Sequence, residues 1–316
     1  MEALILTPDS APLTRDIADY PEGIIIPIDK PYRWTSADVI RKVKYAAIRQ
    51  FGKKNLKVGH AGTLDPLATG VLLVCIGKAT KLAEELQSHD KEYIAGVTFG
   101  ATTPSYDLEK EIDRFFPHEH ISAETVSEAL PGFLGEQDQV APLFSAKSVD
   151  GVRAYELARK LHKEGKTLDE AAQELIRTAR ISITELELLT FEGGSGCGLP
   201  DRATTLAAGV VSDEQTAQWA FAANSHDKVV GGVVLQTAST SASSRINVTD
   251  NSALGLPRAV IRMACSKGTY VRAFARDLGE ALGSGAHLDS LQRSRSGQFR
   301  VERALSVEQA IGKMAL

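Results

Sequence analysis

The sequence predicts an α+β fold, in which short apolar strands and amphipathic helices follow one another along the chain. Its 316 residues are 43% hydrophobic, which is enough to bury a large core in one or two domains. The runs 24–28 and 71–76 are rich in Ile, Val and Leu and are bounded by glycine or proline, as buried strands are. Residues 36–47 instead repeat apolar side chains at helical spacing.

Composition excludes several classes of protein. Cys75, Cys197 and Cys265 are odd in number and far apart, so neither a disulfide framework nor a zinc site with paired ligands is expected. Residues 1–23 lack the basic start and apolar core of a secretory signal, and no run is long enough to span a membrane. We therefore expect a soluble cytoplasmic protein. The formal net charge of −4 argues against a global positive field that would bind nucleic acid everywhere.

The first predicted helix carries a local basic surface. Thr35 to Asp38 form a capping-box start, and Val39, Val43 and Ala47 recur on one face behind it. Its other side and the following loop lack acidic residues and contain Arg41, Lys42, Lys44, Arg49, Lys53, Lys54 and Lys57. Such a run is usually only a solvated surface, although it also fits phosphate binding.

A glycine-rich loop with one carboxylate precedes the apolar run 71–76. Residues 58–70 read V-G-H-A-G-T-L-D-P-L-A-T-G, so three glycines and Pro66 surround Asp65. Glycine permits positive φ, and proline fixes the direction of the chain after Asp65. On its own, this pattern indicates an aspartate held in a tight turn.

The remaining elements follow in order. Residues 78–86 predict a helix, 93–99 a strand of period two, and 180–188 a further strand. Residues 260–272 predict a strand that leads through a glycine-containing turn into a helix ending at Gly283. Between them, residues 193–256 are rich in Ser, Thr, Ala and Gly and match no motif.

The loop around Asp65 resembles the catalytic motif G-H-x-G-x-L-D-P-x-A-x-G of the TruB family of tRNA pseudouridine synthases. The resemblance implies that Asp65 is the nucleophile, and it identifies further candidates. Lys30 lies in the family's Lys-Pro motif, which helps to shape the active-site cleft. Tyr93, in a D-K-x-Y segment, corresponds to the tyrosine that stacks on the target base. His60 would occupy or brace the place that the flipped base leaves.

Two C-terminal motifs extend the resemblance. Residues 265–272 match C-S-K-G-T-Y-x-R, which makes Tyr270 and Arg272 candidates for base contact and for an ion pair with Asp65. Residues 286–293 match A-H-x-x-x-L-x-R and place Leu291 in the uridine pocket. The chain departs from the family at Lys110, where a glycine is usual, and in residues 141–151.

The resemblance implies a pseudouridine synthase fold, with a mixed, mostly antiparallel sheet flanked by helices and a central RNA-binding cleft. Residues 1–22 would form an N-terminal tail and 23–316 the catalytic domain, with the insertion at about 193–256 and no C-terminal PUA domain. The implied substrate is the T-arm uridine at tRNA position 55. The implied enzyme uses no metal or other cofactor, has no obligate protein partner and is a monomer. A second basic group would also bind phosphates: Arg293, Arg295, Arg300 and Arg303.

Parts of the sequence also suggest three other functions. A P-loop around Gly77 and Lys78 fails, because Leu73 and Ala79 occupy positions that require Gly and Ser or Thr. The G-x-x-G spacing of residues 59–62 fits a KH loop, but such loops lie between helices, and a strand is predicted here. A family member that acts mainly as a tRNA-folding chaperone remains possible, and a catalytically dead variant would distinguish it.

Overall fold

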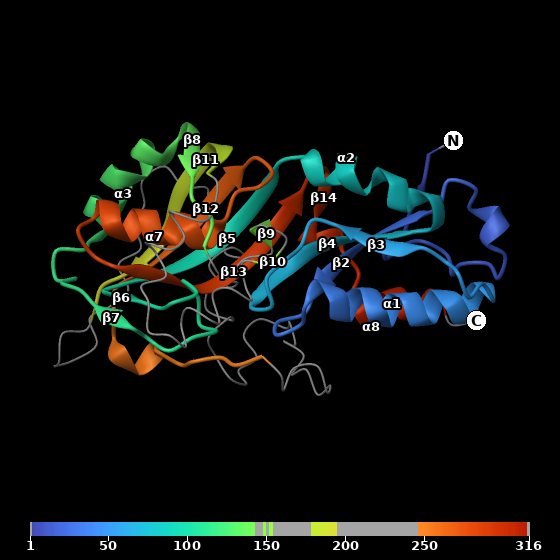
Figure 1. Ribbon diagram of the computed structural model, residues 1–316, viewed down its shortest axis with the longest axis horizontal. Coiled ribbons are helices and arrows are strands. Elements are labelled where there is room, and N and C mark those ends of the chain that lie inside the picture. Colours follow the sequence, from blue (N-terminus) through green and yellow to red (C-terminus); the bar gives the residue numbers. More distant parts are fainter. Residues whose placement is uncertain (1, 143–147, 150–151, 154–177, 195–245, 315–316) are drawn as a thin grey trace. The chain divides into compact units, whose positions relative to one another are not determined.

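The computed structural model describes residues 2–142, 148–149, 152–153, 178–194 and 246–314 (Figure 1). The chain divides into two compact units. Unit 1 contains Met1–Tyr93, Gln236–Ile246 and Leu291–Leu316, and unit 2 contains Ile94–Leu235 and Asn247–Ser290. Most of the predicted insertion at 193–256 lies outside the described residues. The two units are described separately below.

Unit 1 is built on a mixed sheet with the strand order β1-β2-β4-β13. These strands are β1 (Leu4–Ile5), β2 (Ile24–Lys30), β4 (Ala68–Ile76) and the C-terminal part of β13 (Ala286–Ser296). Strand β2 is antiparallel to β4, whereas β1 runs parallel to β2 and β13 runs parallel to β4. Two further antiparallel strands complete it, β3 (Val58–Ala61) on β4 and β14 (Phe299–Arg300) on β13.

Helices lie on both sides of the β2–β4 strands (Figure 1). Helix α1 (Ser36–Phe51) begins with the predicted capping box and ends at Gly52, which has a left-handed φ of 60°. It contacts α8 (Val307–Gly312), while α2 (Ala83–Ser88) follows the 3₁₀ turn η2 (Gly77–Leu82) on the other side. The helix predicted over 78–86 is thus a 3₁₀ turn followed by a short α-helix.

The N-terminal segment, predicted as a tail, packs within unit 1. It contributes β1 and the 3₁₀ turn η1 (Ile17–Asp19), and Leu6 and Leu13 are fully buried. The Gln50 side chain of α1 donates hydrogen bonds to the carbonyls of Leu13 and Thr14, at 2.8 and 3.0 Å. Hydrogen bonds therefore fix this segment to α1 and to the residue that follows α8.

The main strands of unit 2 are hydrogen-bonded in the order β13-β5-β12-β11-β8, with the N-terminal part of β13 in this unit. Its strands include β5 (Lys91–Phe99), β12 (Arg258–Cys265), β11 (Ala179–Glu192) and β8 (Gly135–Gln139). Strand β11 is antiparallel to both β12 and β8. Two small antiparallel pairs are also present, β6 (Ala101–Thr102) with β7 (Arg114–Phe115) and β9 (Ser148–Val149) with β10 (Val152–Arg153).

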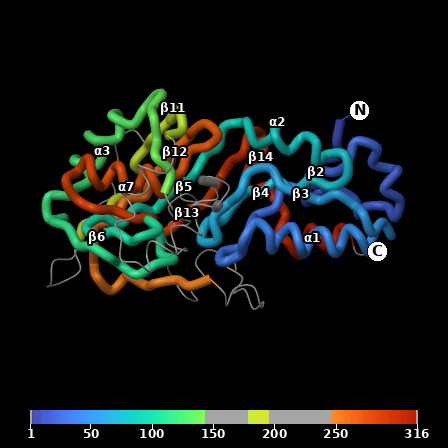
Figure 2. The backbone as a smooth tube through the Cα atoms, in the orientation of Figure 1, coloured from blue at the N-terminus to red at the C-terminus, as the bar shows by residue number. Residues whose placement is uncertain are grey.

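Within its described residues, unit 2 contains the helices α3 (Ala123–Ala129) and α7 (Val271–Ala281), whose chain paths Figure 2 traces. The 3₁₀ turn η3 (Leu130–Phe133) follows α3, and Phe133 packs edge-on against Phe274 of α7, with ring centroids 5.4 Å apart. Shorter 3₁₀ turns are η5 (Ser252–Leu254) in unit 2 and η6 (Val301–Arg303) in unit 1. The predicted α+β class, with a mixed sheet flanked by helices, is confirmed.

A buried histidine makes the stability of unit 2 depend on pH. His287 is fully buried, with Nδ1 2.9 Å from the Ala101 carbonyl and Nε2 3.5 Å from Asn251 Nδ2. Burial lowers its pKa, although the hydrogen bond to Ala101 and the carboxylates of Asp289, Asp107 and Asp113 partly oppose this shift. In the neutral ring, the Nε2 lone pair can accept from the Asn251 amide. Protonation of His287 would place an N–H donor there, facing the Asn251 N–H donor.

We therefore expect the free energy of unfolding to fall as the pH drops below about 6.5, the ordinary value for histidine. The unfolded chain then binds a proton that the folded chain resists, so the contribution of His287 is complete above that pH and is lost below it. Chemical denaturation of wild type and His287→Gln between pH 8 and 5 checks this, with the exposed His120→Gln as control. Identical pH dependence of wild type and His287→Gln would contradict it.

Candidate active site

Asp65 lies in unit 1 on the loop that joins β3 to β4. The two strands form an antiparallel hairpin in which Ala61 pairs with Leu73. Gly62 has a φ of 86°, and the Asp65 carbonyl accepts a hydrogen bond from the Ala68 amide at 3.1 Å. Asp65 itself is partly exposed, which leaves a positioned carboxylate within reach of a ligand.

The start of α1 fixes this loop. The buried Ser36 hydroxyl accepts a hydrogen bond from the Leu64 amide at 3.0 Å and also contacts the Leu64 carbonyl at 3.2 Å. Leu64 and Leu67 are buried on either side of Asp65. The Thr-Ser pair that the sequence assigned to a helix start therefore also satisfies the backbone next to the candidate nucleophile.

Lys30, the last residue of β2, is fully buried and contacts the same loop. Its ammonium donates hydrogen bonds to the carbonyls of Pro31, Trp34 and Pro66, at 2.9, 2.6 and 3.2 Å. Burial lowers its pKa to about 7, while the carboxylates of Asp65 and Asp29 oppose this shift. Lys30 is therefore not a surface lysine, and its hydrogen bond to the Pro66 carbonyl joins β2 directly to the Asp65 loop. A direct contact with substrate stays a prediction.

The predicted role of Arg293 is wrong, because its side chain is buried. It was grouped with Arg295, Arg300 and Arg303 as a phosphate-binding residue, but only 1% of its surface is exposed. Its Nε donates to the Val71 carbonyl at 2.7 Å, and its Nη2 donates to the Gly62 carbonyl at 3.2 Å. Because β13 pairs with β4 here, Arg293 serves backbone acceptors inside the unit.

Three other candidates lie in unit 1. His60, on β3, is partly exposed, and its buried Nδ1 has no hydrogen-bond partner among the described residues. Burial, and secondarily Arg293, lowers the pKa of His60, which favours the neutral ring. Leu291 is half-buried and pairs in register with Ala68, three residues after Asp65. Tyr93 is 8% exposed and lies on β5. Their roles toward a base stay predictions.

Tyr270 and Arg272 lie in unit 2, at the start of α7. The buried Gln139 side chain holds Tyr270 by accepting from its amide at 2.8 Å and donating to its carbonyl at 3.2 Å. No motif indicated Gln139, because its contacts span 131 residues of sequence.

Arg272 is only 5% exposed, so it is not a surface arginine. Its Nη1 donates to the Ser105 carbonyl at 3.0 Å, and its Nε lies 3.8 Å from Asp107 Oδ2. The Ser105 hydroxyl in turn donates to Asp107 at 2.6 Å. Arg272 and Asp65 belong to different units, and their predicted ion pair stays a prediction.

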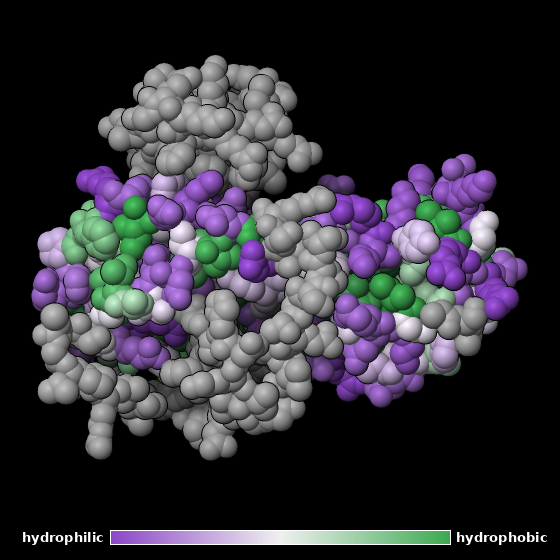
Figure 3. Space-filling view, turned by 90° about the horizontal axis from the view of Figure 1, so that it is seen from below, coloured by the Kyte–Doolittle hydropathy of each residue, from purple (hydrophilic) through white to green (hydrophobic). Residues whose placement is uncertain are grey.

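The basic surface of α1 is present as predicted. All of the cations that the sequence analysis named between Arg41 and Lys57 are exposed, and Arg41 forms an ion pair with Asp38 at 3.0 Å. Tyr45 is 68% exposed, one helical turn from both Arg41 and Arg49. The side of unit 1 that includes α1 is mostly hydrophilic in Figure 3.

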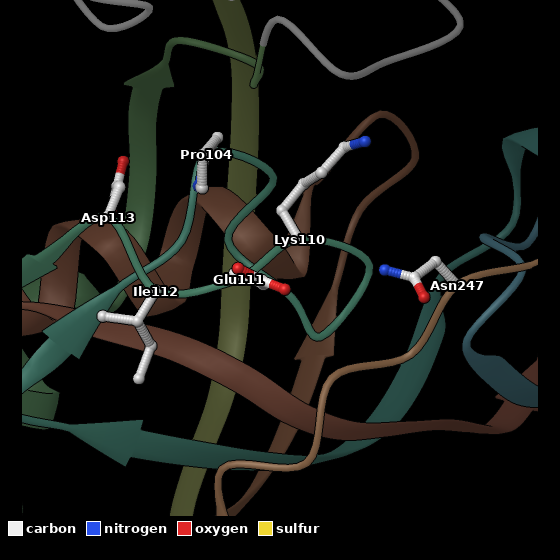
Figure 4. Close-up of a pocket in the computed structure, with 6 residues that line it drawn as sticks. All are labelled: Pro104, Lys110, Glu111, Ile112, Asp113 and Asn247. Atoms are coloured by element: carbon white, nitrogen blue, oxygen red, sulfur yellow. The ribbon is translucent and has the colours of Figure 1, made fainter.

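A pocket in unit 2 contains none of the candidate residues. It is lined by Pro104, Lys110, Glu111, Ile112, Asp113 and Asn247 (Figure 4). Lys110, which stands where the family usually has glycine, is one of the residues that line this pocket. The Asp113 carboxylate accepts a hydrogen bond from the Thr102 hydroxyl at 2.7 Å.

Among the residues that the structure describes, no group of three or more His, Cys, Asp or Glu side chains could hold a metal ion. No described helix is both long enough and apolar enough to cross a membrane.

Comparison with known proteins shows which class of enzyme this chain resembles. A model of the TruB family pseudouridylate synthase N-terminal domain matches residues 49–195, which include Asp65, so the class is that of the pseudouridylate synthases. The chain is 44% identical over 290 residues to "tRNA pseudouridine synthase B" of Phocaeicola vulgatus, covering 92% of each chain. It is 38% identical to the protein of that name from Thermus thermophilus, covering 91% of this chain and 78% of the relative. The chain therefore belongs to the TruB family.

A solved structure is also similar. A chain in the "Crystal Structure of a Cbf5-Nop10-Gar1 Complex" aligns with a TM-score of 0.48 and 21% identity. The alignment covers 95% of this chain and 60% of that one.

Proposed function

We propose that this protein is a tRNA pseudouridine synthase that converts the T-arm uridine at tRNA position 55 to pseudouridine. The observation that carries the proposal is the Asp65 loop, where a partly exposed carboxylate stands on a backbone held by Ser36, Lys30 and Arg293. Membership of the TruB family and the name shared by its relatives support it. We further propose that the enzyme acts in the cytoplasm as a monomer without an obligate protein partner.

In the proposed reaction, Asp65 acts as the nucleophile, the C1′–N1 glycosidic bond breaks, and ribose rejoins the same base through C5. The isomerisation is redox-neutral, and its atoms balance because C5 loses its proton as it joins the ribose while N1 gains a proton. The uridine must first leave its stack, because its reacting atoms cannot be reached in folded RNA. Tyr93 and Tyr270 would receive the base beside Leu291, and His60 would brace the vacated place.

Assaying purified protein on an unmodified tRNA transcript tests the proposal. We expect pseudouridine at position 55 and none in a transcript that has cytidine there. Absence of product from folded, tRNA-binding protein would contradict the enzymatic function. If a catalytically dead variant retained the full biological effect, a role as a tRNA-folding chaperone would be favoured instead.

We propose that the exposed cations of α1 and the loop after it bind the phosphates of tRNA. The basic surface begins beside the catalytic loop, since Ser36 at the start of α1 contacts Leu64. An exposed aromatic ring among cations is also suited to stacking on an unpaired base, which gives Tyr45 a place in the same surface.

Replacing Lys42, Lys44, Lys53 and Lys54 by Gln should weaken tRNA binding and flatten its salt dependence. Each lost phosphate contact reduces the slope of log affinity against log salt by up to about 1, because fewer counterions are released. The single-turnover rate on saturating, bound tRNA should change little. Gln replacement of Lys81, an exposed lysine of η2 on the other side of the β2–β4 strands from α1, serves as control. An unchanged slope in the fourfold variant would show that the run is only a solvated surface.

A further inference from the structure

The Arg293 side chain joins the two ends of the segment that carries Asp65. Gly62 directly follows β3, and Val71 lies in β4 after the loop, so their carbonyls stand on opposite sides of Asp65 in the sequence. One guanidinium donates to both, through Nη2 to Gly62 and through Nε to Val71. The contact joins a C-terminal strand to residues more than 200 positions earlier, at separations of 231 and 222.

The backbone around this contact is shaped for close approach. Gly70 pairs with Arg293 in register and has a φ of 96°. A Cβ at Gly70 would lie 2.2 Å from the Arg293 carbonyl, a distance that no side chain can occupy. A Cβ at Gly62 would lie 3.5 Å from Arg293 Nη1, and the φ of 86° at Gly62 also favours glycine. The glycines of the catalytic motif therefore bring its backbone to Arg293.

The positive charge of Arg293 also acts on its surroundings. Arg293 is buried, and its guanidinium donates to the Gly62 and Val71 carbonyls. Lys30 is fully buried in the same unit, and Arg293 acts on it electrostatically with the opposite sign to the carboxylates of Asp65 and Asp29. The charge of Arg293 therefore acts on the same buried lysine as the candidate nucleophile.

We propose that Arg293 is a positioning residue of the reaction, which holds the Asp65 loop through the Gly62 and Val71 carbonyls and does not bind RNA phosphate. The inference rests on the proposed function, since it concerns the geometry of attack by Asp65. Both anchored carbonyls flank the loop, so removal of the guanidinium releases both of its ends. A misplacement of about 1 Å at a reacting group can cost on the order of 100-fold in rate.

The test uses Arg293→Lys and Arg293→Met in the full chain. A lysine can reach one carbonyl at a time, whereas methionine donates to neither, so we expect the order wild type, Lys, Met in kcat. The expected loss in kcat is about 10-fold for Lys and about 100-fold for Met, with KM for tRNA and its salt dependence unchanged. The exposed Arg180, which pairs with Glu136 at 3.1 Å in unit 2, provides the control variant Arg180→Lys.

A phosphate contact predicts the opposite pattern. It would leave kcat unchanged, raise KM and reduce the salt slope by about 1, with most of the binding restored in Arg293→Lys, and this result would overturn the proposal.

Hydrogen exchange provides a measurement that does not depend on turnover or on the Met variant folding. In folded Arg293→Lys, we expect the amides of residues 62–65 to exchange at least about tenfold faster, while those of α1 keep their wild-type rates. Unchanged exchange in the loop would overturn the proposal. If wild type forms no pseudouridine, the proposed function fails, yet faster loop exchange in Arg293→Lys would still establish the restraint.

Discussion

Asp65→Asn is expected to abolish pseudouridine formation while the protein remains folded and binds tRNA. Asparagine keeps the size and most of the hydrogen bonding of aspartate but lacks the anionic oxygen needed for attack. We expect the rate to fall by at least about 10⁴-fold, as for the loss of other enzymatic nucleophiles. The loop should persist, because hydrogen bonds to the backbone atoms of Leu64 and Pro66 hold it and are unchanged by the substitution.

Single-turnover formation of pseudouridine and equilibrium tRNA binding, measured on the same preparation, check this result. Asp138→Asn, at an exposed position on β8, removes a carboxylate of unit 2 and should leave both quantities unchanged. An Asp65→Asn enzyme with a rate near that of wild type would show that another group makes the attack.

Local sequence patterns predicted the elements whose hydrogen bonds and caps come from residues close by in the sequence. Helix α1 has its cap, its apolar stripe and its terminal Gly52 within one continuous stretch, so propensity and structure agree. The Asp65 loop was recognisable for a similar reason, since Gly62 and Gly70 adopt positive φ on either side of it. These requirements of the backbone appear directly as residue types in the sequence.

Contacts between distant residues could not be predicted in this way. Arg293 belongs to a C-terminal basic group, and charge patterning alone predicts a solvated or phosphate-binding surface for such a group. Its actual acceptors are carbonyls of Gly62 and Val71, which side-chain types do not reveal. The same holds for Gln139, whose amide satisfies the backbone of Tyr270, and for Lys30 with its three carbonyl acceptors.

Replacement of Arg272 should cause the second-largest loss of activity. We propose that its guanidinium pairs with Asp65 when the base-filled site excludes water, because a carboxylate there needs a charge partner. Arg272→Lys loses the planar fork that can hold a carboxylate at two points, and Arg272→Met loses the charge as well. We expect turnover to fall at least about 100-fold in both variants, with tRNA binding close to that of wild type.

The surroundings of Arg272 in unit 2 provide the control for this prediction. Its contacts with the Ser105 carbonyl and with Asp107 could be purely structural. In that case Asp107→Asn, which weakens the same contacts and leaves Arg272 in place, would lower turnover as much as Arg272→Lys does. If Arg272 instead acts on Asp65, Asp107→Asn should retain most of the turnover while it lowers the free energy of unfolding by about 1–3 kcal/mol. Wild-type turnover in Arg272→Met would exclude the ion pair with Asp65, because the methionine side chain carries no charge and donates no hydrogen bond.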